Sequence, residues 1–214
     1  VICNLAIALA MLVIVLGAYT RLTDAGLGCP DWPGCYGQLA IPQAHHADEA
    51  AVLYPERPLE PHKARNEMVH RYLAGSLGML IGVIFLLSWR LHPKKWGYPA
   101  LLVAIVVAQA ALGMWTVTMK LHPLVVMGHL LGGMTLLSVL WLYRMSLSPI
   151  DAVASKSPSG RLRKVGGIAA LLVLGQIALG GWTSANYAAM ACVDLPVCHS
   201  GWLSQLDFKE AFHL

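Results

Sequence analysis

Five long apolar stretches, separated by polar segments, dominate the pattern of this chain. They cover residues 2–19, 68–89, 98–118, 124–143 and 165–183. Each approaches the ~20 residues that a helix needs to cross a hydrocarbon core of ~30 Å. Hydrophobic residues make up 57% of the 214 residues and charged residues only 12%, about half the charged share of a soluble domain. The pattern therefore predicts an all-α polytopic membrane protein.

The basic residues predict the orientation of these spans. The segment after the second stretch carries Arg90, Lys94 and Lys95, and five more basic residues follow the fourth stretch, whereas Lys120 is alone between the third and fourth. Because basic loops stay in the cytoplasm, we expect a cytoplasmic N-terminus and an outer loop over residues 21–66. The net charge of +4 comes with no basic stripe interleaved with aromatic residues, so no nucleic-acid partner is expected.

Two cysteine pairs with the same spacing reveal an internal repeat. Cys29 and Cys35 are separated by five residues, as are Cys192 and Cys198, and the offset of 163 also aligns Gly17-Ala-Tyr-Thr20 with Gly180-Gly-Trp-Thr183. A constant offset of this kind indicates a duplicated helix-plus-loop unit. We therefore predict a four-helix transmembrane bundle followed by the first helix of a duplicated second bundle. The expected divisions are 1–145, a cytoplasmic linker over 146–164, and 165–214.

Both cysteine pairs fall on the expected outer side, where disulfides persist. A bond between Cys29 and Cys35, and another between Cys192 and Cys198, would each close a small ring and stabilise its loop. A redox-active pair is the alternative, although redox-active dithiols usually have two intervening residues rather than five. Cys3 lies within the first span and is interpreted as a small apolar core residue.

Only two of the nine histidines lie within the spans, namely His70 and His129. Ionisable side chains at membrane depth are costly and point to a functional site. Both histidines begin inward-running spans, so we expect them at similar depth near the outer surface. Small residues follow them on the same helix faces and would leave room for a porphyrin: Ala74, Gly78, Gly82, Gly132 and Gly133. We interpret the pair as axial ligands of a heme iron; close helix packing over small residues is the alternative.

Two charged residues flank His70. Glu67 precedes it by three positions and shares its helix face. Arg71 follows it at the membrane boundary, where a guanidinium can bind a heme propionate in bidentate fashion. The alternatives are a first-turn acid favoured by the helix dipole and an interfacial arginine whose head reaches water.

The motif Glu67-Met-Val-His-Arg71 and the loop Arg21-Leu-Thr-Asp-Ala-Gly-Leu-Gly-Cys-Pro-Asp-Trp-Pro-Gly-Cys-Tyr-Gly37 closely resemble the heme A synthase family, and the resemblance extends over the whole chain. It implies eight spans in two four-helix halves, with heme O bound by His70 and His129 in the first half. It also implies that Glu67 is the acid beside a heme methyl group that is oxidised to a formyl group, giving heme A. Heme b would bind in the second half, beyond this chain.

The resemblance further implies a multi-pass protein of the bacterial inner (cell) membrane that serves terminal oxidase biogenesis. Heme O synthase, cytochrome oxidase assembly factors and a second copy of the chain are candidate partners besides the lipid bilayer. Because the chain starts at Val1 without an initiator methionine, we expect a fragment of a longer protein. Two other functions stay open: a bis-histidine membrane cytochrome for electron transfer, and a membrane thiol-disulfide oxidoreductase acting through the cysteines.

Overall fold

The computed structural model describes residues 1–91, 94–147 and 159–188. It confirms the predicted all-helical membrane protein, because five helices are long and apolar enough to cross a membrane and no strand occurs among the described residues. These helices are α1 (Ile2–Leu22), α3 (Pro61–Leu91), α4 (Gly97–Thr118), α5 (Pro123–Ser146) and α6 (Gly160–Ala185).

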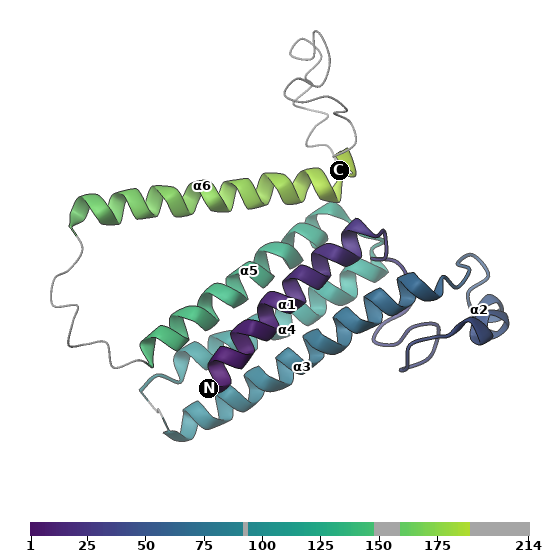
Figure 1. Cartoon of the computed structure of the whole chain (residues 1–214), viewed down its shortest axis with the longest axis horizontal. Helices are drawn as coiled ribbons and strands as arrows, with labels where there is room; N and C mark the ends of the chain where they lie inside the picture. Colours follow the sequence, from purple (N-terminus) through teal and green to yellow (C-terminus); the bar gives the residue numbers. More distant parts are fainter. Residues whose placement is uncertain (92–93, 148–158, 189–214) are drawn as a thin grey trace, which may run out of the picture.

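Helices α1, α3, α4 and α5 form a four-helix bundle (Figure 1). Helix α1 packs against α3 and α5, and α4 packs against the same two helices, so α3 and α5 lie diagonally across the bundle from one another. Short connections explain which helices are neighbours. For example, α4 and α5 are joined by only four residues and are therefore adjacent and antiparallel. The two helices that carry His70 and His129 are therefore positioned to present side chains to a shared interior.

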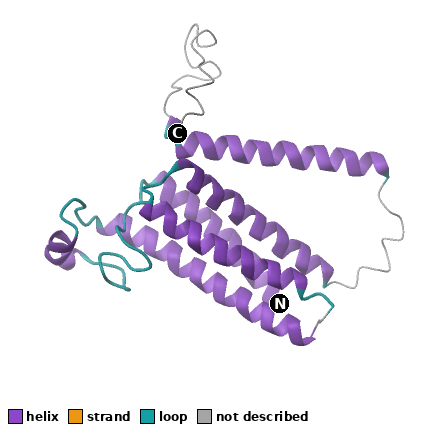
Figure 2. Ribbon diagram, turned by 180° about the vertical axis from the view of Figure 1, so that it is seen from behind, coloured by secondary structure: helices purple, strands orange, loops and turns teal. Residues whose placement is uncertain are grey.

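Helix α3 begins at Pro61, seven residues before the predicted start of its apolar stretch. Proline is favoured in the first turn of a helix because it lacks the N–H that the first turn leaves unpaired. The added segment is polar, so hydrophobic length alone could not reveal it. The loop before it also contains a 3-10 turn, η1 (Ala44–His46), and a short helix, α2 (Ala47–Leu53), both at the projecting end of α3 (Figure 2).

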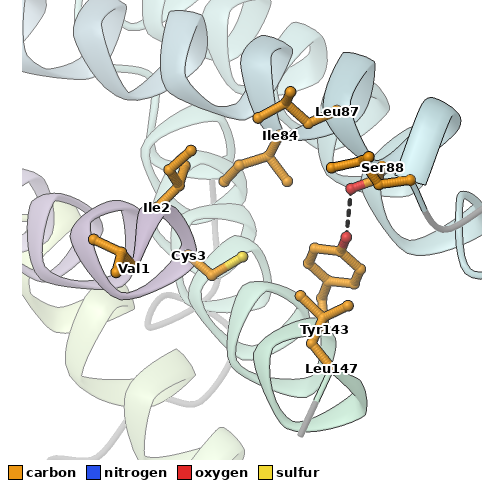
Figure 3. Close-up of a pocket in the computed structure, with 9 residues that line it drawn as sticks. Val1, Ile2, Cys3, Ile84, Leu87, Ser88, Tyr143 and Leu147 are labelled. Carbon is orange, nitrogen blue, oxygen red and sulfur yellow. Dashed lines mark hydrogen bonds between the residues drawn. The ribbon is translucent and has the colours of Figure 1, made fainter.

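The half of the bundle nearest the N-terminus has a continuous apolar core, which includes Ala6, Ile81, Leu102 and Leu140. At its end, a cleft of about 360 Å³ opens between α1, α3 and α5. Inside the cleft, the hydroxyl groups of Ser88 and Tyr143 share a hydrogen bond (Figure 3). Because its walls are otherwise apolar, the cleft offers no set of polar groups for chemistry.

Helix α6 starts at Gly160, inside the predicted linker, because the Ser159 side chain caps it by accepting a hydrogen bond from the Leu162 amide (3.3 Å). It lies across the bundle and approaches it at its C-terminal end (Figure 1). There Arg21 of α1 donates to the Ser184 carbonyl (2.5 Å) and lies 3.7 Å from the ring centre of Tyr187. Arg21 and Ser184 are equivalent positions of the 163-residue repeat, so corresponding helix ends meet here.

Candidate functional site

The buried core of the bundle is interrupted in one layer. On α1, no residue between Ala10 and Thr20 is fully buried. The same holds on α3 between Met68 and Leu77, on α4 between Leu102 and Val117, and on α5 between Met127 and Leu136, all within the described helices. At 1.5 Å per residue, the layer is about 14 Å deep along α3 and α5. Well-packed protein interiors rarely leave such a layer without fully buried residues.

His70 and His129 lie in this layer. Each imidazole has its Nδ1 atom buried without a hydrogen-bond partner among the described residues, and buried polar atoms of this kind are uncommon. His70 approaches the backbone carbonyl of Val13 on α1, and His129 approaches that of Gln109 on α4, both of which lie in the same layer. The structure therefore brings the two predicted histidines to one interior region from diagonally opposite helices.

The small residues that follow the histidines face different neighbours. A Cβ atom on Gly78 would lie 3.3 Å from a methyl group of Val106, and one on Gly132 would overlap the side-chain amide of Gln109. Gly82 has no such neighbour within 4 Å. Part of the predicted porphyrin face thus serves contacts with α4, which is the alternative foreseen for small residues in membrane helices.

Glu67 is the only buried charged residue in the described part of the chain. One carboxylate oxygen accepts the Cys29 amide (2.8 Å), and the other pairs with Nη2 of Arg71 (2.5 Å). These donors satisfy a charge that would otherwise be expensive to bury. Glu67 therefore ties the loop that precedes α3 to this helix, one helical turn from His70.

Arg71 completes the attachment of the loop. Its Nη1 donates to the carbonyl oxygens of Asp31 (3.0 Å), Pro33 (3.3 Å) and Gly34. The Arg71 side chain thus holds the loop in place, a structural role that the sequence did not suggest. A contact between Arg71 and a heme propionate stays a prediction, and it would fall to the remaining N–H groups of the guanidinium.

The clamped loop has its own small core. Asp31 accepts the backbone N–H groups of Tyr36 (2.6 Å) and Gly37 (2.9 Å). Burial raises the pKa of the Tyr36 hydroxyl, which stays protonated and donates to the Pro58 carbonyl (3.2 Å). Gly28 allows the loop to approach α3, since a Cβ atom there would lie 2.6 Å from the carbonyl carbon of Lys63. The loop is therefore a folded cap at the end of the bundle where α3 begins.

The predicted bond between Cys29 and Cys35 is present in this cap, and both residues are fully buried. Cys3 is free and buried in the apolar core, as expected. The second pair, Cys192 and Cys198, lies outside the described residues. Burial of the first pair fits a structural staple better than a thiol that must meet a redox partner.

The donor set fits a heme iron better than a free metal ion. In the described part of the chain, no group of three or more His, Cys, Asp or Glu side chains could hold a metal. Two imidazoles suffice for a heme, because the porphyrin supplies the other ligands. His122 also has a buried Nδ1 atom without a partner, and it is a competing candidate at the start of α5. His45, in the loop between α1 and α3, is exposed.

Comparison with known proteins identifies the family. A sequence profile described as "COX15-CtaA: Cytochrome oxidase assembly protein" matches residues 1–214. The chain belongs to this family. No solved structure matches the chain significantly.

Curated relatives in this family carry the name heme A synthase. The relative from Shewanella oneidensis is 48% identical over 98% of this chain and 64% of its own length. The relative from Shouchella clausii is 26% identical over 94% of this chain and 64% of its length, and that from Rhizobium rhizogenes is 28% identical over 86% and 55%. The chain thus spans under two thirds of the length of these relatives.

Proposed function

We propose that this chain forms the substrate half of a heme A synthase, which oxidises a methyl group of heme O to a formyl group. The observation that carries the proposal is the pair of half-buried imidazoles in a bundle layer without fully buried residues. Membership of a family whose relatives are named heme A synthase supports it.

In this proposal, His70 and His129 bind the iron of heme O from diagonally opposite helices. The heme supplies the redox-active iron and the reacting methyl group, whereas the protein supplies position and electrostatics. The apolar core fixes the depth of the substrate on one side, and the disulfide-bonded cap separates it from water on the other.

Glu67 is the proposed proton acceptor beside the methyl group. If water is the oxygen source, replacing a methyl with a formyl group follows R–CH₃ + H₂O → R–CHO + 4 H⁺ + 4 e⁻. Four protons must therefore leave the site, and four electrons must pass to an external electron-accepting redox partner. The Cys29 amide and Arg71 hold the carboxylate in place, and a fixed carboxylate in a low-dielectric site favours nearby positive charge. Arg71 provides a second link between Glu67 and the cap, beside the direct bond from the Cys29 amide.

We also propose a cytoplasmic N-terminus, cysteine-bearing loops on the outer side, and the bacterial inner membrane as the location. The basic segment that contains Arg90, Lys94 and Lys95 supports this orientation. Heme b is the proposed cofactor of the second half. Heme O synthase and cytochrome oxidase assembly factors are the proposed partners.

Heme analysis in a host that makes heme O but lacks heme A synthase tests the proposal. The protein, expressed in its full-length context, should yield formyl-bearing heme A in the membrane extract. Bound heme without any heme A would favour the electron-transfer cytochrome instead. A purified protein without a Soret band, and with an activity that depends on Cys29, would favour the thiol-disulfide oxidoreductase.

A further inference from the structure

Three helix ends of this chain share the pattern Gly-x-aromatic-Thr. It occurs at residues 17–20 in α1, 113–116 in α4 and 180–183 in α6. In all three, the residue seven positions after the glycine has a positive φ: 52° at Asp24, 50° at Lys120 and 55° at Tyr187. The three segments therefore share one backbone form at the end of the helix.

The first two copies also share a side-chain contact. The Thr20 hydroxyl donates to the Gly17 carbonyl (2.8 Å), and the Thr116 hydroxyl donates to the Gly113 carbonyl (2.7 Å). In the third copy, the Thr183 hydroxyl donates to the Leu179 carbonyl instead. The α1 and α4 ends are thus alike in detail, and each glycine lies five residues before the last residue of its helix.

Each of these two glycines faces a histidine from the neighbouring helix. A Cβ atom on Gly17 would lie 3.0 Å from Cε1 of His70, and one on Gly113 would lie 3.5 Å from Cε1 of His129. The pairs α1/α3 and α4/α5 therefore repeat one arrangement, in which an imidazole edge rests on a helix backbone at a position without a side chain. Cε1 lies between the two ring nitrogens, so this contact bears directly on the orientation of both.

We infer that Gly17 and Gly113 are positioning residues, which seat the two imidazoles so that their ring nitrogens address the heme iron. This inference rests on the proposed function and adds residues to it. The two glycine–histidine contacts, which we call seats, differ in how much space they leave for a side chain at the glycine. A methyl group on Gly17 would force His70 to move by a few tenths of an ångström, whereas one on Gly113 would make ordinary contact with His129.

The difference between the seats gives a graded test. We would purify the protein in its full-length context with Gly17→Ala, Gly113→Ala or Gly113→Val, and titrate each with heme O. Electron paramagnetic resonance would report the orientation of the axial imidazoles. Gly75→Ala is the matched control, because it is the same change at an exposed position on the helix of His70. A Cβ atom added there would have no neighbouring atom within 4 Å.

Gly17→Ala and Gly113→Val should shift the low-spin resonance and weaken heme O binding about two- to tenfold, the cost of forcing a side chain off its rotamer. Gly113→Ala, whose added methyl group makes ordinary contact with His129, should change both quantities less than Gly17→Ala does, and Gly75→Ala should match the wild type. A Gly17→Ala protein with the resonance and affinity of Gly75→Ala would overturn the inference. If Gly17→Ala does not fold, the comparison of Gly113→Ala with Gly113→Val decides it. A wild-type protein that binds no heme would instead refute the proposed function, and the inference with it.

Discussion

Replacement of Glu67 by glutamine separates its two roles, as proton acceptor and as anchor of the cap. Glutamine keeps the shape of the side chain but removes the charge that the Cys29 amide and Arg71 now meet. The Glu67 and Arg71 side chains are only 8% and 13% exposed. A hydrogen bond to a charged group in such a place contributes about 1.5–3 kcal/mol.

Loss of one hydrogen bond of this strength raises the equilibrium constant for opening of the cap about 10- to 160-fold, because 1.36 kcal/mol corresponds to a factor of ten. Hydrogen exchange at the Cys29 amide, which donates to Glu67, measures this opening. Glu67→Gln should therefore exchange faster at this amide, retain heme O and produce no heme A. Glu67→Ala leaves Arg71 without its buried partner, which costs about 3–5 kcal/mol.

Glu60→Gln is the control, because Glu60 is a half-exposed carboxylate near the start of α3 that pairs with the exposed His62 and the partly buried Lys63. It should keep wild-type exchange and wild-type heme A output. Normal heme A formation by Glu67→Gln would remove Glu67 from the chemistry. Unchanged exchange at the Cys29 amide would refute its role as anchor.

Three further changes test the cap and the bundle. Cys29→Ser should lower the stability of the cap by about 2–3 kcal/mol in thermal unfolding, yet heme A should still form; its loss with the fold intact would favour thiol chemistry. Gly28→Ala should destabilise the cap by about 1–3 kcal/mol through overpacking, whereas Gly97→Ala, with nothing within 4 Å, should not. Tyr143→Phe leaves the Ser88 hydroxyl unpaired and should cost about 1–3 kcal/mol; unchanged heme content is expected, because this pair lies at the other end of the bundle.

The sequence predicted the five spans because each depends on an uninterrupted apolar length, which is a local property. It missed the start of α3 at Pro61, because the residues before Met68 are polar. A search for apolar stretches does not detect a helical turn that lies outside the apolar segment. It also missed the fold of the cap. The roles of Asp31 and Gly28 depend on contacts with backbone groups that a residue pattern does not reveal.

The two site histidines could be selected from the sequence, because an ionisable residue within a span is rare. Their similar depth was also expected, because both lie near the start of a span that runs in the same direction. The diagonal placement of α3 and α5 could not be derived, since it depends on which helices pack together. The glycines that follow His129 looked like space for a ligand, but Gly132 accommodates Gln109. The glycines that contact the two histidines are instead Gly17 and Gly113, on the neighbouring helices α1 and α4.

The central claim is that His70 and His129 together hold heme O within the first bundle. Its most direct test is heme extraction from the purified full-length protein after loading with heme O, with heme types resolved by chromatography. His70→Ala and His129→Ala should each lose heme O and heme A but retain any heme b, whereas His122→Ala should retain all of them. Retention of heme O with an unchanged spectrum in the His70→Ala, His129→Ala double variant would contradict the account.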